Sequence, residues 1–170
     1  MLRLWEVMQA AHLTYEPRYY ALAERSRYLD AAARYIDGLV RDPDAICIVC
    51  ADAGNLWGSL VAKVEKKPPV YTDVSVASID HVCVDEAHRG KGVFRRMYAL
   101  LESTASKRSV DSIECYVDCD NSALAAYRAI GMVPRQMRMV KHIQKDAAPG
   151  ATSSDSMLPD PQSSSAVRRE

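Results

Sequence analysis

Apolar side chains in the N-terminal part of the chain recur with the period of an α-helix. The first series predicts that the chain opens in a helix, and it comprises Leu4, Trp5, Met8, Ala11 and His12. The second series follows Pro17 and comprises Tyr28, Ala32, Tyr35, Ile36 and Leu39. We expect this second helix to end at residues 42–44, because the Asp-Pro-Asp sequence there disfavours helical backbone.

The pattern in the middle of the chain is typical of strands. Residues 45–50 form a short apolar run, Asp-Ala-Gly-Asn at 52–55 predicts a turn, and residues 56–65 supply the hairpin partner. A Lys-Lys-Pro-Pro loop at 66–69 precedes a further strand at about 76–84. The hairpin indicates that part of the sheet is antiparallel.

Helical periodicity returns after this strand. The expected helix spans about 93–108, and its apolar face comprises Val93, Met97, Leu100, Leu101 and Thr104. Residues 113–118 predict a strand, 122–130 a short helix stopped by Gly131, and 132–143 a final extended or hairpin segment. This order predicts a mixed α/β fold with one antiparallel part and one parallel crossover.

Length and charge limit the classes of partner. The 170 residues suit one domain and a tail, and the 22 Lys and Arg balance the 22 Asp and Glu, so we expect neither a nucleic-acid nor a membrane partner. No apolar run approaches the ~20 residues that cross a bilayer, and the N-terminus lacks the zones of a signal peptide. We therefore expect a cytoplasmic protein. We place the domain at residues 1–145 and a disordered tail, removable without loss of activity, at 146–170, where Pro, Ser, Asp, Ala and Gly dominate.

The five cysteines do not indicate disulfides or a metal site. Cys47 and Cys50 have the spacing of a metal ligand pair, but no second pair or histidine set completes a zinc site. Most cysteines lie in strand-like apolar runs. We expect buried, reduced thiols and no metal.

The most distinctive stretch joins the strand at 76–84 to the helix that begins at 93. Gly90 and Gly92 stand one residue apart before the helix, where glycine permits positive φ and the helix N-terminus presents free N–H groups. Such a loop binds anions, above all phosphates. The P-loop and the dinucleotide fingerprint do not fit, since Val93 follows Gly92 and Arg95 replaces a third glycine. The alternative is a strand–helix turn with a solvated basic face.

Together with Asn121, Tyr127 and Gly131, this stretch resembles the GNAT superfamily of acetyl-CoA-dependent N-acetyltransferases. The resemblance covers about residues 4–143 and is most specific from 79 to 132. It implies the acyl-CoA N-acyltransferase fold, a central mixed sheet flanked by helices. Relatives usually begin with a short strand, whereas this sequence starts inside the first helix, so either the start is truncated or the sheet lacks its first strand. The strand at 45–50 or its neighbour then becomes an exposed edge, which suggests a possible homodimer.

The resemblance also implies where acetyl-CoA binds. In the family a Gln/Arg-x-x-Gly-x-Gly/Ala loop cradles the coenzyme A pyrophosphate, and Arg89, Gly92 and Phe94 hold its three defined positions. Phe94 departs from the pattern, and we expect its side chain to turn away from the phosphates. The implied coenzyme-binding residues are Val82, Cys83, Val84, Arg89, Gly90, Lys91, Gly92, Val93, Phe94, Arg95, Asn121 and Tyr127.

Acetyl transfer to an amine requires a route for the amine's proton. Strand alternation predicts Ser78, Asp80, Val82 and Val84 on one face and His81 on the other. Several relatives carry Glu at the position of Asp80, as an amine-positioning group or a base acting through water, and the shorter Asp favours a bridging water. The alternative is an edge aspartate paired with Lys or Arg. For His81 we expect a structural role.

The reaction also requires an oxyanion donor and an acid for the departing thiolate. In the family this strand splays from its neighbour, which implies a free backbone N–H near Val82 or Cys83. The family places Asn121 against the coenzyme arm and Tyr127 near the sulfur, where a phenol can donate a proton. Read without the family, Asn121 is a helix N-cap and Tyr127 part of an apolar helix face.

The acceptor side is the least specific part of the prediction. Helices before the hairpin line this side in the fold, and Tyr19 and Tyr28 are candidate contacts for a cationic amine or a peptide N-terminus. Asp118 resembles an acid of some amino-sugar acetyltransferases and is a further candidate. We expect direct transfer, because Cys83 and Cys119 lack an evident base. The alternative function is a non-catalytic acyl-CoA-binding or partner-binding domain.

Overall fold

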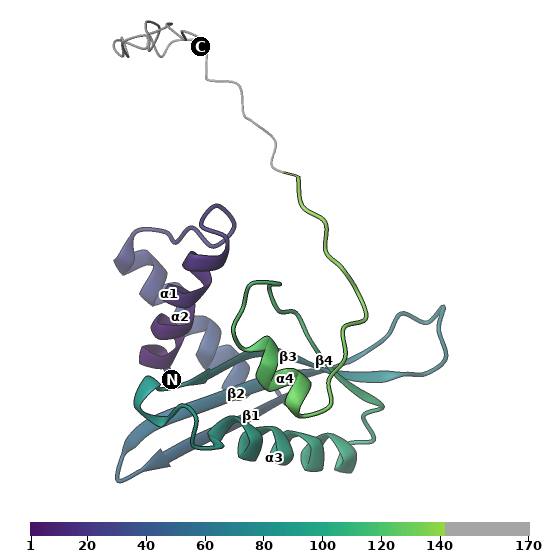
Figure 1. Cartoon of the computed structure of the whole chain (residues 1–170). Helices are drawn as coiled ribbons and strands as arrows, with labels where there is room; N and C mark the ends of the chain where they lie inside the picture. Colours follow the sequence, from purple (N-terminus) through teal and green to yellow (C-terminus); the bar gives the residue numbers. More distant parts are fainter. Residues whose placement is uncertain (142–170) are drawn as a thin grey trace, which may run out of the picture. The chain divides into compact units, whose positions relative to one another are not determined.

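Two helices precede the sheet in the computed structural model, which describes residues 1–141 (Figure 1). Helix α1 spans Leu2–Tyr15 and helix α2 spans Arg25–Arg41, as the apolar series predicts. The Glu24 carboxylate accepts hydrogen bonds from the first N–H groups of α2 and defines its start. The residues of α2 that become buried are Ala32, Ile36 and Leu39.

The sheet has four strands in the order β1-β2-β3-β4. Their bounds are Ala45–Asp52, Asn55–Lys66, Ser75–Val84 and Ser112–Cys115. The first three strands pair antiparallel, and β4 pairs parallel to β3. The predicted mixed sheet is thus confirmed, although β4 ends three residues before the predicted strand end at Asp118.

The crossover from β3 to β4 contains the 3-10 turn η1 (Glu86–His88) and helix α3 (Val93–Lys107). The buried face of α3 is rotated from the predicted face, since Tyr98 and Ala105 are buried while Leu100 is 55% exposed. A short helix α4 (Leu124–Ala129) follows β4. It begins two residues later than predicted, because Asn121 and Ser122 belong to the preceding turn.

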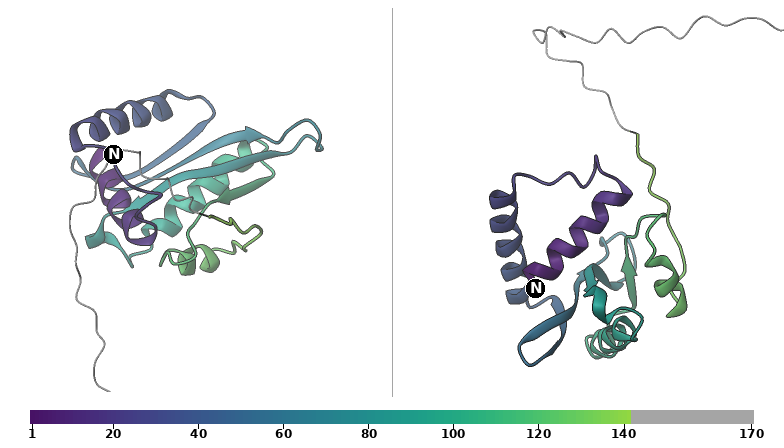
Figure 2. Two further views of the ribbon diagram at one scale, coloured as in Figure 1. Left: turned by 90° about the horizontal axis from the view of Figure 1, so that it is seen from above. Right: turned by 60° about the vertical axis from the view of Figure 1, so that its left-hand side comes forward.

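Helices cover both faces of the sheet. Figure 2 shows α1 and α2 on one face and α3 on the other. Between α3 and the sheet, Leu60, Met97 and Leu101 have no exposed surface. On the face of α1, Leu4 and Val61 are also buried, at 1% and 0% exposure. The sheet is thus enclosed between two apolar layers.

A β-bulge interrupts β3 at Asp80. Val61 lies opposite His81 and Ala62 opposite Ile79, so Asp80 is an extra residue without a partner on β2. The bulge reverses the alternation, because Asp80 and His81 both contact the α1–α2 side while Val82 packs with the α3 core. The prediction that His81 faces away from Asp80 is therefore wrong.

The compact N-terminal unit comprises Met1–Pro134. No strand forms at residues 132–141, so the predicted final extended segment is not part of the sheet over that range, and residues 142–143 are not described. The predicted domain end at 145 and the predicted tail at 146–170 also lie outside the described residues.

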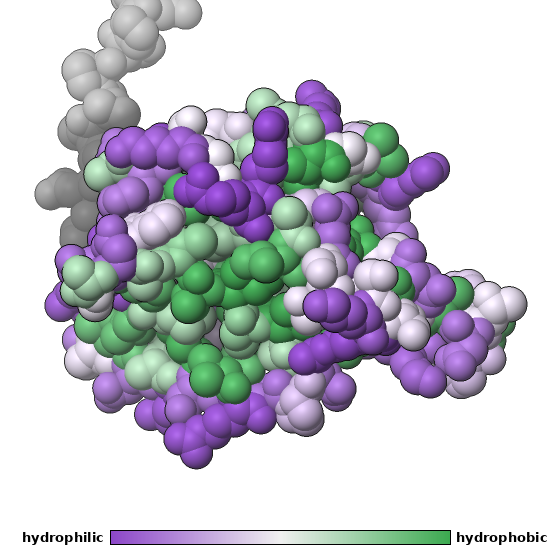
Figure 3. Space-filling view, turned by 90° about the horizontal axis from the view of Figure 1, so that it is seen from below, coloured by the Kyte–Doolittle hydropathy of each residue, from purple (hydrophilic) through white to green (hydrophobic). Residues whose placement is uncertain are grey.

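Strand β1 is an edge of the sheet, since β2 is its only paired neighbour among the described residues. Apolar side chains gather in the middle of the face seen in Figure 3. Large apolar residues that are more than half exposed include Val40 on α2, Val49 on β1 and Leu100 on α3. A dimer through β1 stays a prediction. Within residues 1–141 no helix is long and apolar enough to cross a membrane.

The thiols are all free, but the prediction that most are buried is wrong. Only Cys83 is buried, whereas Cys47 and Cys119 are exposed. Cys47 lies on the edge strand β1, which is covered less completely than the central strands.

Candidate active site

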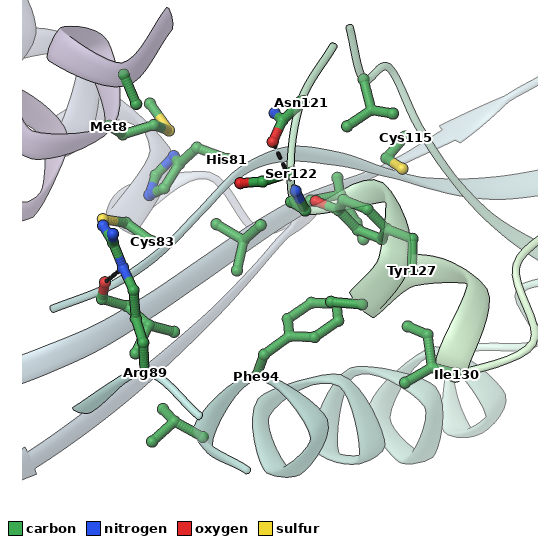
Figure 4. Close-up of a pocket in the computed structure, with 18 of the residues that line it drawn as sticks. Met8, His81, Cys83, Arg89, Phe94, Cys115, Asn121, Ser122, Tyr127 and Ile130 are labelled. Atoms are coloured by element: carbon green, nitrogen blue, oxygen red, sulfur yellow. Dashed lines mark hydrogen bonds between the residues drawn. The ribbon is translucent and has the colours of Figure 1, made fainter. Parts of the chain in front are cut away.

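A cleft of about 650 Å³ opens where β3 and β4 separate (Figure 4). The pairing of these strands ends at Ile79 and Cys115, and beyond this pair β3 continues to Val84 while the chain after Cys115 turns toward α4. The cleft is lined by α1 at one end and by the loop before α3 at the other. It brings together residues that are far apart in the sequence.

The edge of β3 that faces the cleft carries free backbone groups. The Asp85 N–H donates to the Trp57 carbonyl on β2 at 2.9 Å, so alternation directs the Cys83 N–H to β2 and the Val82 and Val84 N–H groups to the cleft. The Arg89 Nε donates to the Val84 carbonyl at 3.2 Å, which agrees with this direction. The free donor nearest the middle of the cleft is therefore the N–H of Val82.

The loop before α3 has the geometry of an anion site. Gly90 and Gly92 have φ values of +72° and +73°, which side chains other than glycine rarely adopt. Gly92 is the N-cap of α3, and the Arg96 N–H donates to its carbonyl at 3.1 Å. The preceding N–H groups of the first turn have no helical acceptor. Of the predicted loop residues, all but Lys91 line the cleft.

Phe94 points from α3 toward α4 rather than along the loop (Figure 4). Its ring meets the ring of Tyr127 edge to face, with centroids 5.3 Å apart, and contacts Tyr98 at 6.0 Å. Phe94, which stands where the family has a small residue, thus adds packing between α3 and α4. The backbone of the loop remains exposed to the cleft.

Tyr127 lies on α4 and extends toward the gap between the strands (Figure 4). The residue is 8% exposed. Burial raises the pKa of Tyr127 well above its usual range, and the nearby Cys115 adds to the shift. The phenol therefore stays protonated at neutral pH and can act as a proton donor.

Asn121 lies at the same end of the cleft. Its Oδ1 accepts from the Ala123 N–H at 2.9 Å and from the Tyr15 hydroxyl at 3.5 Å. The first bond shapes the turn before α4, while the second joins this turn to α1. The amide nitrogen has no hydrogen-bond partner among the described residues and is available to a ligand.

A second polar group lies on the α1 side of the cleft. The Tyr35 hydroxyl of α2 donates to Asp80 Oδ1 at 2.5 Å, and His81 Nδ1 lies 3.3 Å from Asp80 Oδ2. The ring of Trp5 packs edge-on against the imidazole at 5.3 Å and against Tyr35 at 5.4 Å. Sequence analysis identified Asp80 but missed its contacts with Tyr35 and His81, because a single sequence gives no sign of them.

Electrostatics keep the Asp80 carboxylate ionised. Burial alone would raise the pKa of Asp80. The hydrogen bonds from His81 and Tyr35 and the charge of Lys63 have the opposite and larger effect, so the pKa of Asp80 is below its ordinary value. Burial and the neighbouring carboxylate raise the pKa of Tyr35 well above its usual range. Asp80 is thus a hydrogen-bond acceptor between two donors.

The three predicted acceptor contacts do not line the cleft. Asp118 accepts a hydrogen bond from the Tyr20 hydroxyl at 3.0 Å, Tyr28 borders a smaller hollow between α1 and α2, and Tyr19 is 53% exposed. The wall opposite the loop is formed instead by α1, through Val7, Met8, Ala11, His12 and Tyr15. The helical period identified Met8, Ala11 and His12 of this wall, and the resemblance implied that the helices before the hairpin line the acceptor side.

Within residues 1–141, no three His, Cys, Asp or Glu side chains come close enough together to hold a metal ion. His12 and His88 line the cleft at separate places. Burial lowers the pKa of His12, and Asp118 opposes that shift.

Comparison with known proteins identifies a family. The family model described as "Acetyltransferase (GNAT) family" matches residues 5–132. A search of curated protein sequences found no match.

Solved structures share the fold. A mutant of the BH1408 protein from Bacillus halodurans has a TM-score of 0.73 and 23% identity, covering 84% of this chain and 90% of that chain. A ribosomal-protein-alanine N-acetyltransferase from Brucella melitensis biovar Abortus has a TM-score of 0.53 and 22% identity, with coverages of 65% and 79%. AAC(6')-Iy, in complex with the bisubstrate analog CoA-S-monomethyl-acetylneamine, has a TM-score of 0.60 and 12% identity, with coverages of 84% and 91%.

Proposed function

The chain belongs to the GNAT acetyltransferase family, and on this premise we propose that it transfers an acetyl group from acetyl-CoA directly to a primary amine. The observation that carries the proposal is the cleft between β3 and β4. It has a glycine-rich helix N-terminus at one end and a hydrogen-bonded Asp80–His81 pair at the other. A thioester that spans the gap would meet an amine held near that pair.

The loop of Gly90 and Gly92 suits the pyrophosphate of coenzyme A. Both glycines have positive φ, and at both a Cβ would meet no protein atom closer than 3.9 Å, so the space over the backbone is free for a ligand. The N-terminus of α3 contributes free N–H groups and a positive dipole end. Asn121 and the open edge of β3 would contact the arm that leads to the thioester.

The described residues supply the remaining requirements of the reaction. A neutral amine attacks the carbonyl carbon, a C–N bond forms, and the Val82 N–H donates to the oxygen that becomes negative. The C–S bond then breaks, and the Tyr127 hydroxyl donates a proton to the sulfur. The phenol regains a proton from the nitrogen of the new amide. The incoming ammonium group loses its proton at the Asp80–His81 pair.

The lining of the cleft indicates the kind of amine. Among the described lining residues Asp80 is the sole carboxylate, and it is already bonded to two donors. The facing wall of α1 is apolar at Val7, Met8 and Ala11. We therefore expect a monoamine with an apolar body, in contrast to the acetylneamine unit of the ligand bound to AAC(6')-Iy.

A second candidate is an acyl-CoA-binding domain without catalysis. Phe94 favours this candidate, because its ring packs against Tyr127. In a binding domain Tyr127 would be a packing residue and not a proton donor. The cytoplasmic location and a dimer through β1 stay predictions under both candidates.

The test is thiol release from acetyl-CoA across a panel of arylalkylamines, alkylamines, aminoglycosides and peptides. Amine-dependent thiol release with formation of the acetylated amine supports transfer. Coenzyme binding without release for any amine favours the binding domain. The Tyr127→Phe variant separates the two, since it lowers turnover in an enzyme and leaves a pure binder unchanged.

A further inference from the structure

The bulge in β3 places two consecutive titratable side chains on one face of the sheet. We propose that His81 is the base that accepts the proton of the acceptor amine, and that Asp80 and Tyr35 are positioning residues that fix its imidazole. This inference rests on the proposed acetyl transfer. It assigns the proton to a specific atom, Nε2 of His81.

Both oxygens of Asp80 already accept a hydrogen bond. Tyr35 donates to Oδ1 at 2.5 Å, and the Nδ1–H of His81 donates to Oδ2 at 3.3 Å. A carboxylate stabilised by two donors accepts a further proton reluctantly. Taking a proton from an ammonium group would cost Asp80 part of the stabilisation that these two donors give to its ionised form.

His81 has the complementary arrangement. With Nδ1 protonated toward Asp80, the neutral ring carries its lone pair on Nε2. Nε2 has no hydrogen-bond partner among the described residues, and His81 lines the cleft. Figure 4 shows the imidazole on the same side of the cleft as Met8 of α1, the wall to which we assign the acceptor.

The surroundings restrict rotation of the ring. The Trp5 ring packs edge-on against the imidazole, with an angle of 85° between the two ring planes. His81 is 5% exposed. The groups that face the pair are the uncharged Trp5 from α1, Tyr35 from α2, the Lys63 ammonium from β2 and the Cys83 thiol of β3 itself. Asp80 supplies the negative charge next to the ring.

The proton balance is simple. An ammonium acceptor gives one proton to Nε2 and becomes a neutral amine, whose lone pair forms the C–N bond as described above. The imidazolium returns its proton to water after the products leave. The sum is one ammonium and one thioester converted to one amide, one thiol and one proton.

The test compares His81→Gln, Asp80→Asn and Tyr35→Phe in the full chain. Tyr28→Phe is the matched control, because Tyr28 lies on the same helix as Tyr35 but makes no hydrogen bond to Asp80. We expect His81→Gln to lower kcat by ~10²-fold with unchanged coenzyme affinity. Asp80→Asn lowers kcat by a similar factor, since an amide N–H facing Nδ1 favours the tautomer with a protonated Nε2. Tyr35→Phe lowers it by less, ~3-fold to 10-fold, and Tyr28→Phe not at all.

The pH profile separates a base from a packing residue. The loss in His81→Gln shrinks as the pH rises past the titration of the acceptor, because the amine is then neutral without help. A purely structural defect lowers the rate at every pH. Wild-type kcat in His81→Gln, or a loss that is constant with pH, would overturn the base role.

The tautomer can be measured without turnover. We expect the 15N shifts of His81 to show the Nδ1-protonated neutral ring in the wild type and its loss in Asp80→Asn. An Nε2-protonated ring in the wild type would overturn the positioning by Asp80. If no amine accepts acetyl in the wild type, the proposed function and the base role both fail, whereas failure of the base role alone leaves wild-type turnover intact.

Discussion

The two ends of the cleft are built in different ways. The coenzyme end consists almost entirely of one continuous stretch, from Val82 to Arg95, which passes from a strand through a glycine loop into a helix. The acceptor end draws on α1, α2 and the bulge of β3, with contacts such as Tyr35 to Asp80 across 45 positions. The first is determined by local backbone conformation, the second by tertiary packing.

This difference indicates how each end can vary. The loop depends on positive φ at Gly90 and Gly92. We therefore expect a substitution at either glycine to disrupt it, whereas substitutions elsewhere in the chain leave its backbone unchanged. The acceptor wall of α1 depends on side chains that project from a helix. Those side chains can change without altering the loop, which separates acceptor choice from coenzyme binding.

The largest expected effect is at the coenzyme end. Gly92→Asp places a Cβ at φ +73° and a negative charge where the pyrophosphate would bind, and we expect coenzyme affinity to fall by ~10²-fold or more. Calorimetry with acetyl-CoA measures this. Gly38→Ala in α2 is the control, since its Cβ meets no atom within 4 Å. Unchanged affinity in Gly92→Asp would contradict the loop assignment.

Tyr127→Phe tests the connection between the two ends. Because it removes the proton donor but keeps the ring that packs on Phe94, kcat should fall by ~10²-fold while coenzyme affinity is retained. Acetyl thioesters of more acidic thiols should recover part of the rate. Stopped assays with acetyl-CoA and with a thioester of a more acidic thiol give the ratio of wild-type to variant rate for each donor. An equal loss with every donor would argue against an acid role.

The glycine loop could be predicted from the sequence because its signal is contiguous. Period and glycine spacing were sufficient for β3, the loop and α3, and the positive φ values agree with them. The face of His81 could not be predicted, since alternation assumes an unbroken register and the bulge at Asp80 shifts it by one residue. The resemblance placed the helices before the hairpin on the acceptor side, but Tyr19 and Tyr28 were chosen in place of the α1 wall, because a helical apolar stripe looks the same whether it faces a sheet or a cleft.

Arg89 should have a smaller effect. Its Nε is bonded to the Val84 carbonyl and its side chain is exposed, so Arg89→Ala removes one charge near the expected phosphates and should weaken coenzyme binding by ~10-fold at low salt. The difference from wild type should shrink as the ionic strength rises. A salt-independent loss would indicate that the defect is structural.

The smallest expected effect is at the acceptor wall. Met8→Ala removes apolar surface from α1, and we expect KM for an apolar amine to rise by ~5-fold while acetyl-CoA affinity is unchanged. Steady-state kinetics with both substrates varied measures the two effects. A change in coenzyme affinity instead would show that α1 is not a separate acceptor wall.

The most direct test of acetyl transfer is turnover of the wild-type chain with acetyl-CoA and an apolar monoamine. Thiol release and the acetylated amine should appear in equal amounts, only when both substrates are present. Saturable coenzyme binding with no acetylated product from any amine in the panel would contradict the account, and the chain would then be a binding domain on an acetyltransferase fold.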